Sequence, residues 1–174
     1  MNVNDKESIF LFCICFCSLI TYAINKPIYS VEDTWIVGHN LKNFNNRPLY
    51  INNTNGFILA GDKPVMRLCR GGEIYGTLSF NFMDMSGTYQ LHEFSEIKSM
   101  YKNGHMKWVI EDNRKVGLQI QLEVVPDVEE MGMVVKVKIK GAKSEDQLSW
   151  TWNGQETRNE NLSWKLDCLA YPEV

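Results

Sequence analysis

Apolar and polar side chains alternate along most of this chain, and this alternation constrains the fold more than any other feature. Successive side chains of a β-strand point to opposite faces, so alternation predicts a strand with one buried and one solvent-facing side. We assign such strands to Ile74–Phe82, Val116–Val124, Met133–Ile139 and Leu148–Trp152. Sustained helical periodicity is missing from the sequence. The pattern therefore predicts an all-β domain.

Turn residues separate the alternating segments at short intervals. Asn103-Gly104 lies between Ile97–Lys102 and His105–Glu111, and Asn-Gly favours the type I′ turn that joins two antiparallel strands. Pro126 ends a later strand because proline has no N–H to donate. Residues 97–140 are therefore expected to form a meander of about four strands. Further turns are expected at residues 52–56, 61–64 and 70–73. Strands this dense, without intervening helices, predict an antiparallel sandwich or barrel.

The first 23 residues have the features of a secretory signal peptide. An apolar run from Ile9 to Ile20 is followed by Thr21-Tyr22-Ala23, the small-residue spacing that signal peptidase reads. The run is short for a membrane span, which needs about 20 residues. We expect cleavage after Ala23, export to the periplasm or cell surface, and no membrane association afterwards. The alternative is a retained N-terminal anchor, because Lys6 is the only basic residue before the run.

Residues 24–174 are about the size of one domain. The whole chain has 18 basic and 21 acidic side chains and a net charge of −3. Nucleic-acid binding is not expected, because it needs a concentrated basic surface. The lysines at 136, 138 and 140 alternate with apolar residues and are best explained as the solvated face of a strand. No cofactor or metal site is expected, because the three histidines are far apart in the sequence.

Cys69 and Cys168 are the cysteines that remain after the leader is removed. They could form a disulfide in an oxidising compartment, but the sequence does not show that their Cα atoms come close enough. Two partly buried thiols are the alternative.

No catalytic motif is present, so candidate contact residues come from aromatic and turn clusters. Exported sandwiches that bind sugars use exposed aromatic rings. Trp35, in a segment expected to be irregular, and Trp108, in the hairpin, are candidates for ligand contact. Core packing is the favoured interpretation for Trp108, and also for Trp150 and Trp152. Arg47 and Asp62, on adjacent turns, are further candidates and could form an ion pair, although turn structure explains them more simply.

The chain ends shortly after another strand-like segment at residues 162–169. We expect the sandwich to be incomplete there, with an unpaired edge strand.

Several short motifs resemble one family of exported bacterial proteins. They are listed as follows: Asn46-Arg47-Pro48-Leu49-Tyr50, Asn53, Gly56-Phe57, Leu59-Ala60-Gly61-Asp62-Lys63-Pro64, Gly72, Tyr75-Gly76, Tyr101 with Asn103-Gly104 and Trp108, the strands around Pro126, Leu148-Ser149-Trp150, and Asn153-Gly154. Over roughly residues 30–170 they resemble the start of the family named domain of unknown function 4450, found mostly in Bacteroidetes.

This resemblance implies a supersandwich-like N-terminal domain that precedes a helical catalytic domain, in a layout similar to the six-hairpin glycosidases. It implies polysaccharide or oligosaccharide as the partner, and it assigns no catalytic residue to this chain. The favoured hypothesis is a non-catalytic N-terminal β-sandwich domain of a carbohydrate-active, glycoside hydrolase-like protein in truncated form. The alternatives are a stand-alone carbohydrate-binding module and a small exported glycosidase with paired carboxylates on one sheet face.

Overall fold

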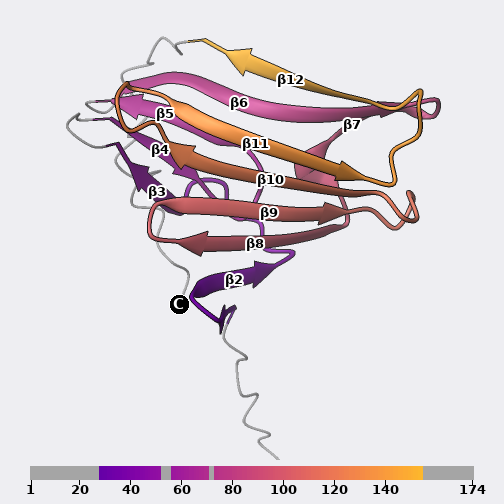
Figure 1. Ribbon diagram of the computed structural model, residues 1–174, viewed down its shortest axis with the longest axis horizontal. Helices are drawn as coiled ribbons and strands as arrows, with labels where there is room; N and C mark the ends of the chain where they lie inside the picture. Colours follow the sequence, from indigo (N-terminus) through magenta and orange to yellow (C-terminus); the bar gives the residue numbers. More distant parts are fainter. Residues whose placement is uncertain (1–27, 52–55, 71–72, 155–174) are drawn as a thin grey trace, which may run out of the picture.

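The computed structural model of the chain describes residues 28–51, 56–70 and 73–154. The expected leader, the turn at 52–55, Gly71-Gly72 and the strand-like segment at 162–169 lie outside the described residues. Within them, two antiparallel sheets pack together (Figure 1), which confirms the predicted β-sandwich.

Most strands of each sheet pair with their neighbours in the chain, except where β2 pairs with β8 and β6 pairs with β12. The first sheet has the order β1-β2-β8-β9-β10-β11. Its strands are β1 (Tyr29–Glu32), β2 (Trp35–His39), β8 (Glu96–Lys102), β9 (His105–Glu111), β10 (Gln119–Pro126) and β11 (Met133–Lys140). The second sheet has the order β12-β6-β5-β4-β3, with β7 paired to β6. Its strands are β3 (Arg47–Tyr50), β4 (Gly56–Ala60), β5 (Met66–Arg70), β6 (Glu73–Asp84), β7 (Gly87–Gln90) and β12 (Gln147–Asn153). A 3₁₀ turn, η1 (Leu91–Glu93), links the two sheets between β7 and β8.

The hairpin predicted at Asn103-Gly104 is confirmed. β8 and β9 pair antiparallel up to Lys102 and His105. Asn103 and Gly104 both have positive φ angles, 35° and 74°, as a type I′ turn requires. β9, β10 and β11 continue the pairing, so the predicted four-strand meander is also confirmed.

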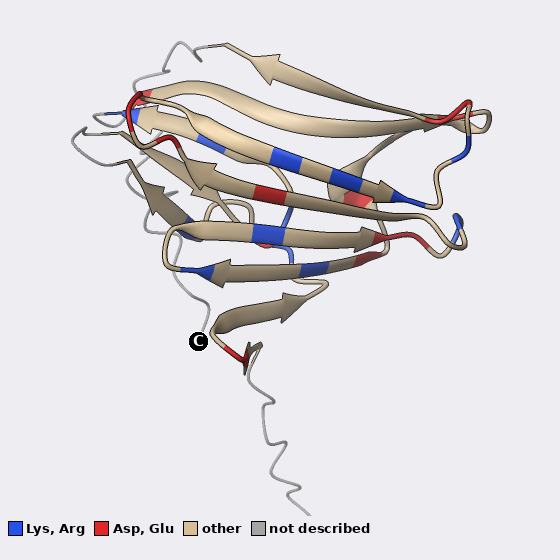
Figure 2. Cartoon of the chain, viewed as in Figure 1, with Lys and Arg blue, Asp and Glu red and all other residues tan. Residues whose placement is uncertain are grey.

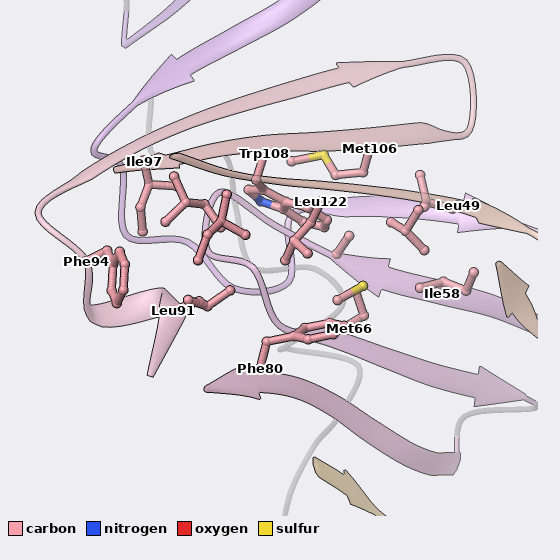
Figure 3. Close-up of a cluster of buried hydrophobic side chains, with 14 of the residues drawn as sticks. Leu49, Ile58, Met66, Phe80, Leu91, Phe94, Ile97, Met106, Trp108 and Leu122 are labelled. Atoms are coloured by element: carbon pink, nitrogen blue, oxygen red, sulfur yellow. The ribbon is translucent and has the colours of Figure 1, made fainter. Parts of the chain in front are cut away.

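Alternate side chains from both sheets form the core between them (Figure 3). Trp108 and Leu122 of the first sheet are 0% exposed. Phe82 of the second sheet is 1% exposed. Leu91 and Phe94, in and just after η1, pack into the same cluster. Complete burial of one such side chain contributes roughly 1.5–3 kcal/mol, so this core is the main source of stability.

Two strand assignments need correction. Trp35 belongs to β2, not to an irregular segment, because β2 pairs with both β1 and β8. The strand expected from Val116 begins at Gln119 instead. Gly117 has a φ of 87°, and Val116 is 97% exposed in the turn that precedes β10. In both places, tertiary pairing and turn geometry override the local alternation.

The two tryptophans of β12 are not core residues, contrary to the favoured interpretation. Trp150 is 66% exposed and Trp152 is 40% exposed. Both side chains lie on the core-facing side of β12, since their partners on β6 are Phe80 and Leu78.

Lysines on β11 form a solvated face, as expected. Lys136, Lys138 and Lys140 are exposed along this strand (Figure 2). Lys136 lies opposite Glu123 of β10, whose carboxylate pairs with Lys107 of β9 at 3.6 Å. The surface charges thus alternate in sign across three strands, which suits a solvent-facing sheet better than a polyanion site.

Candidate functional site

Asp62, in the loop between β4 and β5, is a carboxylate with 1% of its surface exposed. The Tyr29 hydroxyl donates to Oδ2 at 2.7 Å, and the side-chain amides of Asn43 and Asn46 donate to the same oxygen at 3.0 and 3.2 Å. The Ser99 hydroxyl donates to Oδ1 at 3.0 Å. These five residues form the Asp62 cluster. Its four donors satisfy a buried carboxylate that would otherwise be costly to remove from water.

The Asp62 cluster joins the two sheets. Tyr29 and Ser99 lie on β1 and β8 of the first sheet, whereas Asp62 belongs to a loop of the second. A nearby bond makes the same connection, because Trp108 Nε1 on β9 donates to the Gly61 carbonyl at 2.9 Å. Gly61 itself is held so close to Phe44 that a Cβ atom would overlap the Phe44 carbonyl group. The backbone at this junction therefore requires glycine.

Arg47 does not form the expected ion pair with Asp62 among the described residues. Its guanidinium carbon lies 4.4 Å from the centre of the Tyr29 ring, and Nη1 donates to the Asn46 carbonyl at 2.8 Å. Arg47 thus contacts the Asp62 cluster through a cation–π interaction with Tyr29 and a hydrogen bond to Asn46. Burial and the hydrogen bond to Asp62 raise the pKa of the Tyr29 hydroxyl above its usual value of 10.0.

Burial removes two of the four candidate ligand contacts. Trp108 is 0% exposed and Asp62 is 1% exposed, so neither can reach a ligand at the surface. The prediction that Trp108 packs in the core is confirmed. Its indole N–H donates a hydrogen bond to the Gly61 carbonyl.

Trp35 stays a surface candidate. Its ring is partly exposed and packs edge-on against His105, with 5.0 Å between ring centres. Lys102 Nζ lies 5.9 Å from the centre of the Trp35 ring. The buried Nε2 atom of His105 has no hydrogen-bond partner among the described residues. A sugar could stack its apolar face on such a ring and form hydrogen bonds with the polar groups beside it.

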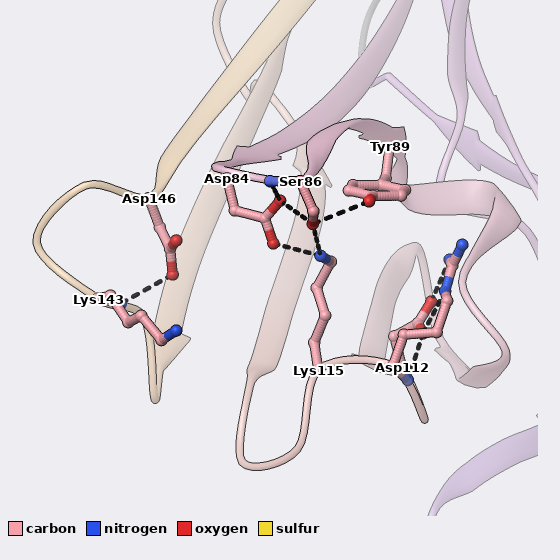
Figure 4. A network of polar contacts seen from close by, with 8 residues as sticks. Asp84, Ser86, Tyr89, Asp112, Lys115, Lys143 and Asp146 are labelled. Atoms are coloured by element: carbon pink, nitrogen blue, oxygen red, sulfur yellow. Dashed lines mark hydrogen bonds and ion pairs between the residues drawn. The ribbon is translucent and has the colours of Figure 1, made fainter.

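A second polar network lies at the other end of the strands, around Lys115 (Figure 4). The ammonium of Lys115, whose side chain is 10% exposed, forms an ion pair with Asp84. It also lies 4.0 Å from the centre of the Tyr89 ring. The Ser86 hydroxyl donates to Asp84 at 2.6 Å, and the Tyr89 hydroxyl donates to Ser86 at 3.0 Å. The network ties the β6–β7 turn to the loop between β9 and β10.

The Lys115 network was not identified from the sequence. Asp84 and Lys115 are 31 positions apart, and a single lysine after a turn has no distinguishing pattern. The turn composition Asp84-Met85-Ser86-Gly87 was the one available signal, since Asp and Ser side chains bond turn backbones.

A cavity of about 430 Å³ opens beside this network. Its lining includes Lys115, Glu96, Glu111, Gln119 and Lys140. Glu96 and Glu111 are directly opposite each other on β8 and β9. Each has an amide donor: Asn40 to Glu96 at 2.8 Å and Gln119 to Glu111 at 2.6 Å.

The aspartates next to the cavity are paired with cations. Lys115 and Ser86 hold the pKa of the Asp84 carboxyl well below its usual range. The guanidinium of Arg114 donates two hydrogen bonds to Asp112, at 2.7 and 2.5 Å, and lowers the pKa of that carboxyl too. Both groups are therefore anions that stabilise loops, the opposite of a carboxylic acid kept protonated for catalysis.

The described part of the chain holds no group of three or more His, Cys, Asp or Glu side chains suited to a metal ion. None of its helices has the length and apolar character needed to span a membrane.

Comparison with known families gives a match that covers residues 72–173, to a family described as "Domain of unknown function (DUF4450)". The chain belongs to the DUF4450 family. No curated protein and no solved structure matches it.

The DUF4450 match includes the Lys115 network, the cavity and β12, whereas Trp35, Arg47 and Asp62 precede it. Cys69 is also outside the match and is buried on β5, with its Sγ 3.9 Å from the Arg67 carbonyl oxygen. Cys168 lies beyond the described residues, so its pairing with Cys69 stays a prediction.

Proposed function

We propose that this DUF4450 chain is a non-catalytic β-sandwich domain of an exported carbohydrate-active protein. The family resemblance of its motifs supplies the expectation of polysaccharide or oligosaccharide as partner, and of a helical catalytic domain in longer relatives. The fold and the family membership are compatible with an N-terminal domain of that kind.

One structural observation carries the non-catalytic part of the proposal. Asp84 and Asp112, beside the cavity, are anions that form ion pairs with Lys115 and Arg114. The Asp62 carboxylate is buried. A glycosidase needs a carboxylic acid that remains protonated to donate to the leaving group. These carboxylates instead stabilise loops and the junction between the sheets.

The test is an assay of the full chain on a panel of polysaccharides, with release of reducing ends as the readout. We expect no release above a buffer control. Hydrolysis that Glu96→Gln or Glu111→Gln abolishes, and that Glu129→Gln at an exposed turn leaves intact, would overturn the proposal. It would favour the small-glycosidase alternative, in which the opposed pair Glu96 and Glu111 does the chemistry.

A second candidate function, glycan binding by this domain alone, is favoured by the Trp35 surface. The ring of Trp35 presents an apolar face beside Lys102 and His105. If a glycan stacks there, soluble oligosaccharides should change the tryptophan fluorescence of the full chain. Trp35→Ala should abolish the change, whereas Tyr50→Ala, which removes another exposed aromatic ring, should not. Equal effects of both variants would exclude this site.

A further inference from the structure

Four strands lie at the edges of the two described sheets: β1 and β11 in the first, and β3 and β12 in the second. Three of them carry charged side chains or proline, which natural proteins use to keep an edge from pairing. β11 has three lysines, β1 has Glu32, and β3 has Arg47 and Pro48. β12, with the sequence QLSWTWN, has neither. Among the described strands, β12 is therefore the edge that is open to a partner strand.

The same strand exposes two large aromatic rings. Trp150 and Trp152 are 66% and 40% exposed, on the core-facing side of β12. The indole of Trp152 lies directly against Gly76 of β6, in the space that a Cβ atom of residue 76 would occupy, so the sheet supports this ring. Two exposed aromatic rings on an unprotected edge mark an interaction surface.

The surroundings of these rings favour a protein partner over a glycan. A sugar-binding ring needs hydrogen-bonding groups close to it. On β6, the residues directly opposite the two rings are Phe80 and Leu78. Leu148, the same-face neighbour of Trp150 on β12, is also apolar. A strand added beside β12 would instead bring apolar side chains against the rings and provide backbone partners for the edge.

The sequence of β12 is symmetric in chemical character about Trp150. At equal distances from this residue lie two hydroxyl side chains, then two apolar side chains, then two amide side chains: Ser149 and Thr151, Leu148 and Trp152, Gln147 and Asn153. When two identical strands pair antiparallel about a two-fold axis, positions equally far from the axis face each other. Two copies of β12 centred on Trp150 would therefore place like beside like along the whole strand.

Charge does not oppose this self-pairing. An identical partner repeats every charge, and like charges directly opposite each other are destabilising. β12 has no charge to repeat, whereas self-pairing of β11 would bring Lys136, Lys138 and Lys140 beside the same three lysines of the copy. The charge pattern of β12 is thus complementary to itself.

The exposed aromatic area suits a reversible dimer. A tryptophan side chain buries roughly 150–250 Å², so the exposed parts of these rings in two copies would remove roughly 300–500 Å² from water. The paired backbones add to this area. Such an interface lies near or below about 1,200 Å², the lower limit for stable complexes, so we expect a dimer that dissociates on dilution.

We propose that β12 pairs antiparallel with β12 of a second copy of this chain, with the two-fold axis at Trp150. Trp150 then faces the partner's Trp150, and Leu148 faces the partner's Trp152, on the core-facing side. The second sheets of the two copies become one continuous sheet. The proposal does not depend on the carbohydrate function.

Sedimentation velocity of the full chain over a range of concentrations tests the dimer. We expect a monomer–dimer equilibrium in the unsubstituted chain. Trp150→Lys, which places two lysines face to face at the axis, should raise the dissociation constant at least about tenfold. Val31→Lys should leave it unchanged, because it adds the same charge at an exposed apolar residue of another edge strand, β1. A monomer at every concentration, an equal effect of both variants, or assemblies larger than a dimer would overturn the proposal.

A charge-swap experiment separates loss of pairing from loss of folding. Trp150→Lys and Trp150→Glu should each be monomeric, because each repels its own copy. Mixed in equal amounts, they should form a dimer that contains one of each, because opposite charges then face each other at the axis. A mixture that remains monomeric would reject two-fold pairing at this residue.

A photo-crosslinking amino acid in place of Trp150 tests the location independently of affinity, in a mixture of isotope-labelled and unlabelled chains. We expect crosslinks between a labelled and an unlabelled chain that join their two β12 peptides. Crosslinks confined to one chain would assign the Trp150 surface to another segment of the same chain. That result, crosslinks to other strands of the second copy, or none, would reject this dimer.

Discussion

At the scale of single residues, the junction between the sheets depends on one buried carboxylate. Asp62 accepts hydrogen bonds from Tyr29, Asn43, Asn46 and Ser99. Removal of the acceptor leaves the buried Ser99 hydroxyl and the half-buried Tyr29 and Asn46 donors without this partner, and an unsatisfied buried donor costs about 1–3 kcal/mol. The cluster therefore contributes to stability through what its loss would leave unsatisfied.

We expect Asp62→Ala to lower the free energy of unfolding by about 3 kcal/mol, whereas Glu129→Ala should change it by less than about 0.5 kcal/mol. Urea denaturation checks both values. In a double-mutant cycle, Tyr29→Phe and Asp62→Asn should show a coupling energy of about 1 kcal/mol. Additive effects would mean that the Tyr29–Asp62 bond contributes nothing.

Gly61 gives a second test at this scale. Because a Cβ atom there would overlap the Phe44 carbonyl, Gly61→Ala must displace backbone and should cost about 3 kcal/mol. Gly132→Ala is the matched control, since its Cβ would meet only Asp127 Cβ, at 3.7 Å. Equal midpoints of thermal unfolding for both variants would contradict this account.

The sequence could indicate single residues here but not their partners. Asp62 and Arg47 are recognisable as turn residues worth attention, yet Tyr29 is 33 positions from Asp62. No local pattern connects them. Asp62 therefore looks the same in the sequence whether it faces a ligand or the interior.

At the scale of elements, alternation and turn chemistry predicted the strands well where pairing is local. The meander from β8 to β11 follows from period-2 patterning and Asn103-Gly104. β7 (Gly87–Gln90) was missed because it is short and has little apolar content. Trp150 and Trp152 show a second limit: alternation identifies the face of a side chain, but it does not show whether another sheet covers that face.

The ion pair between Asp84 and Lys115 makes one connection between elements dependent on pH. The folded state lowers the Asp84 pKa below its usual 3.8, so the pair stabilises the fold at neutral pH, above the unfolded-state pKa. As pH falls below that value, the unfolded state binds more protons than the folded state, and the stabilisation is lost.

Acidification from pH 7 to pH 3 should therefore destabilise the unsubstituted chain more than Asp84→Asn, which carries no titrating group at this position. The difference between their midpoints of urea denaturation, measured at both pH values, should shrink at pH 3. A constant difference would mean that the pair does not contribute.

At the scale of the whole molecule, the fold class was predictable because every strand signal pointed to the same architecture. Each sheet of the described part of the chain has two edge strands, β1 and β11 in the first and β12 and β3 in the second; the expected incompleteness after residue 162 stays a prediction. The assignment of residues to the two sheets was not predictable, because β2 joins β8 and β6 joins β12 across long stretches of sequence.

The leader gives a prediction for the whole chain. If residues 1–23 are a cleaved signal peptide, protein recovered from outside the cytoplasm should begin at Ile24, as determined by N-terminal sequencing. Ala23→Leu should block processing, because signal peptidase needs a small residue at that position. An intact N-terminus in membrane fractions of the unsubstituted protein would instead favour a retained anchor.

The pairing of β12 with β6 has a consequence for the order in which the chain is made. β6 ends at Asp84, but its partner strand is complete only at Asn153. At roughly 10 residues per second, a ribosome needs about 7 s to synthesise the intervening sequence. During this time the nascent chain presents one long edge of β6 with nothing to pair with it. Variants that slow synthesis after Asp84 should thus aggregate more without changing the stability of the finished protein.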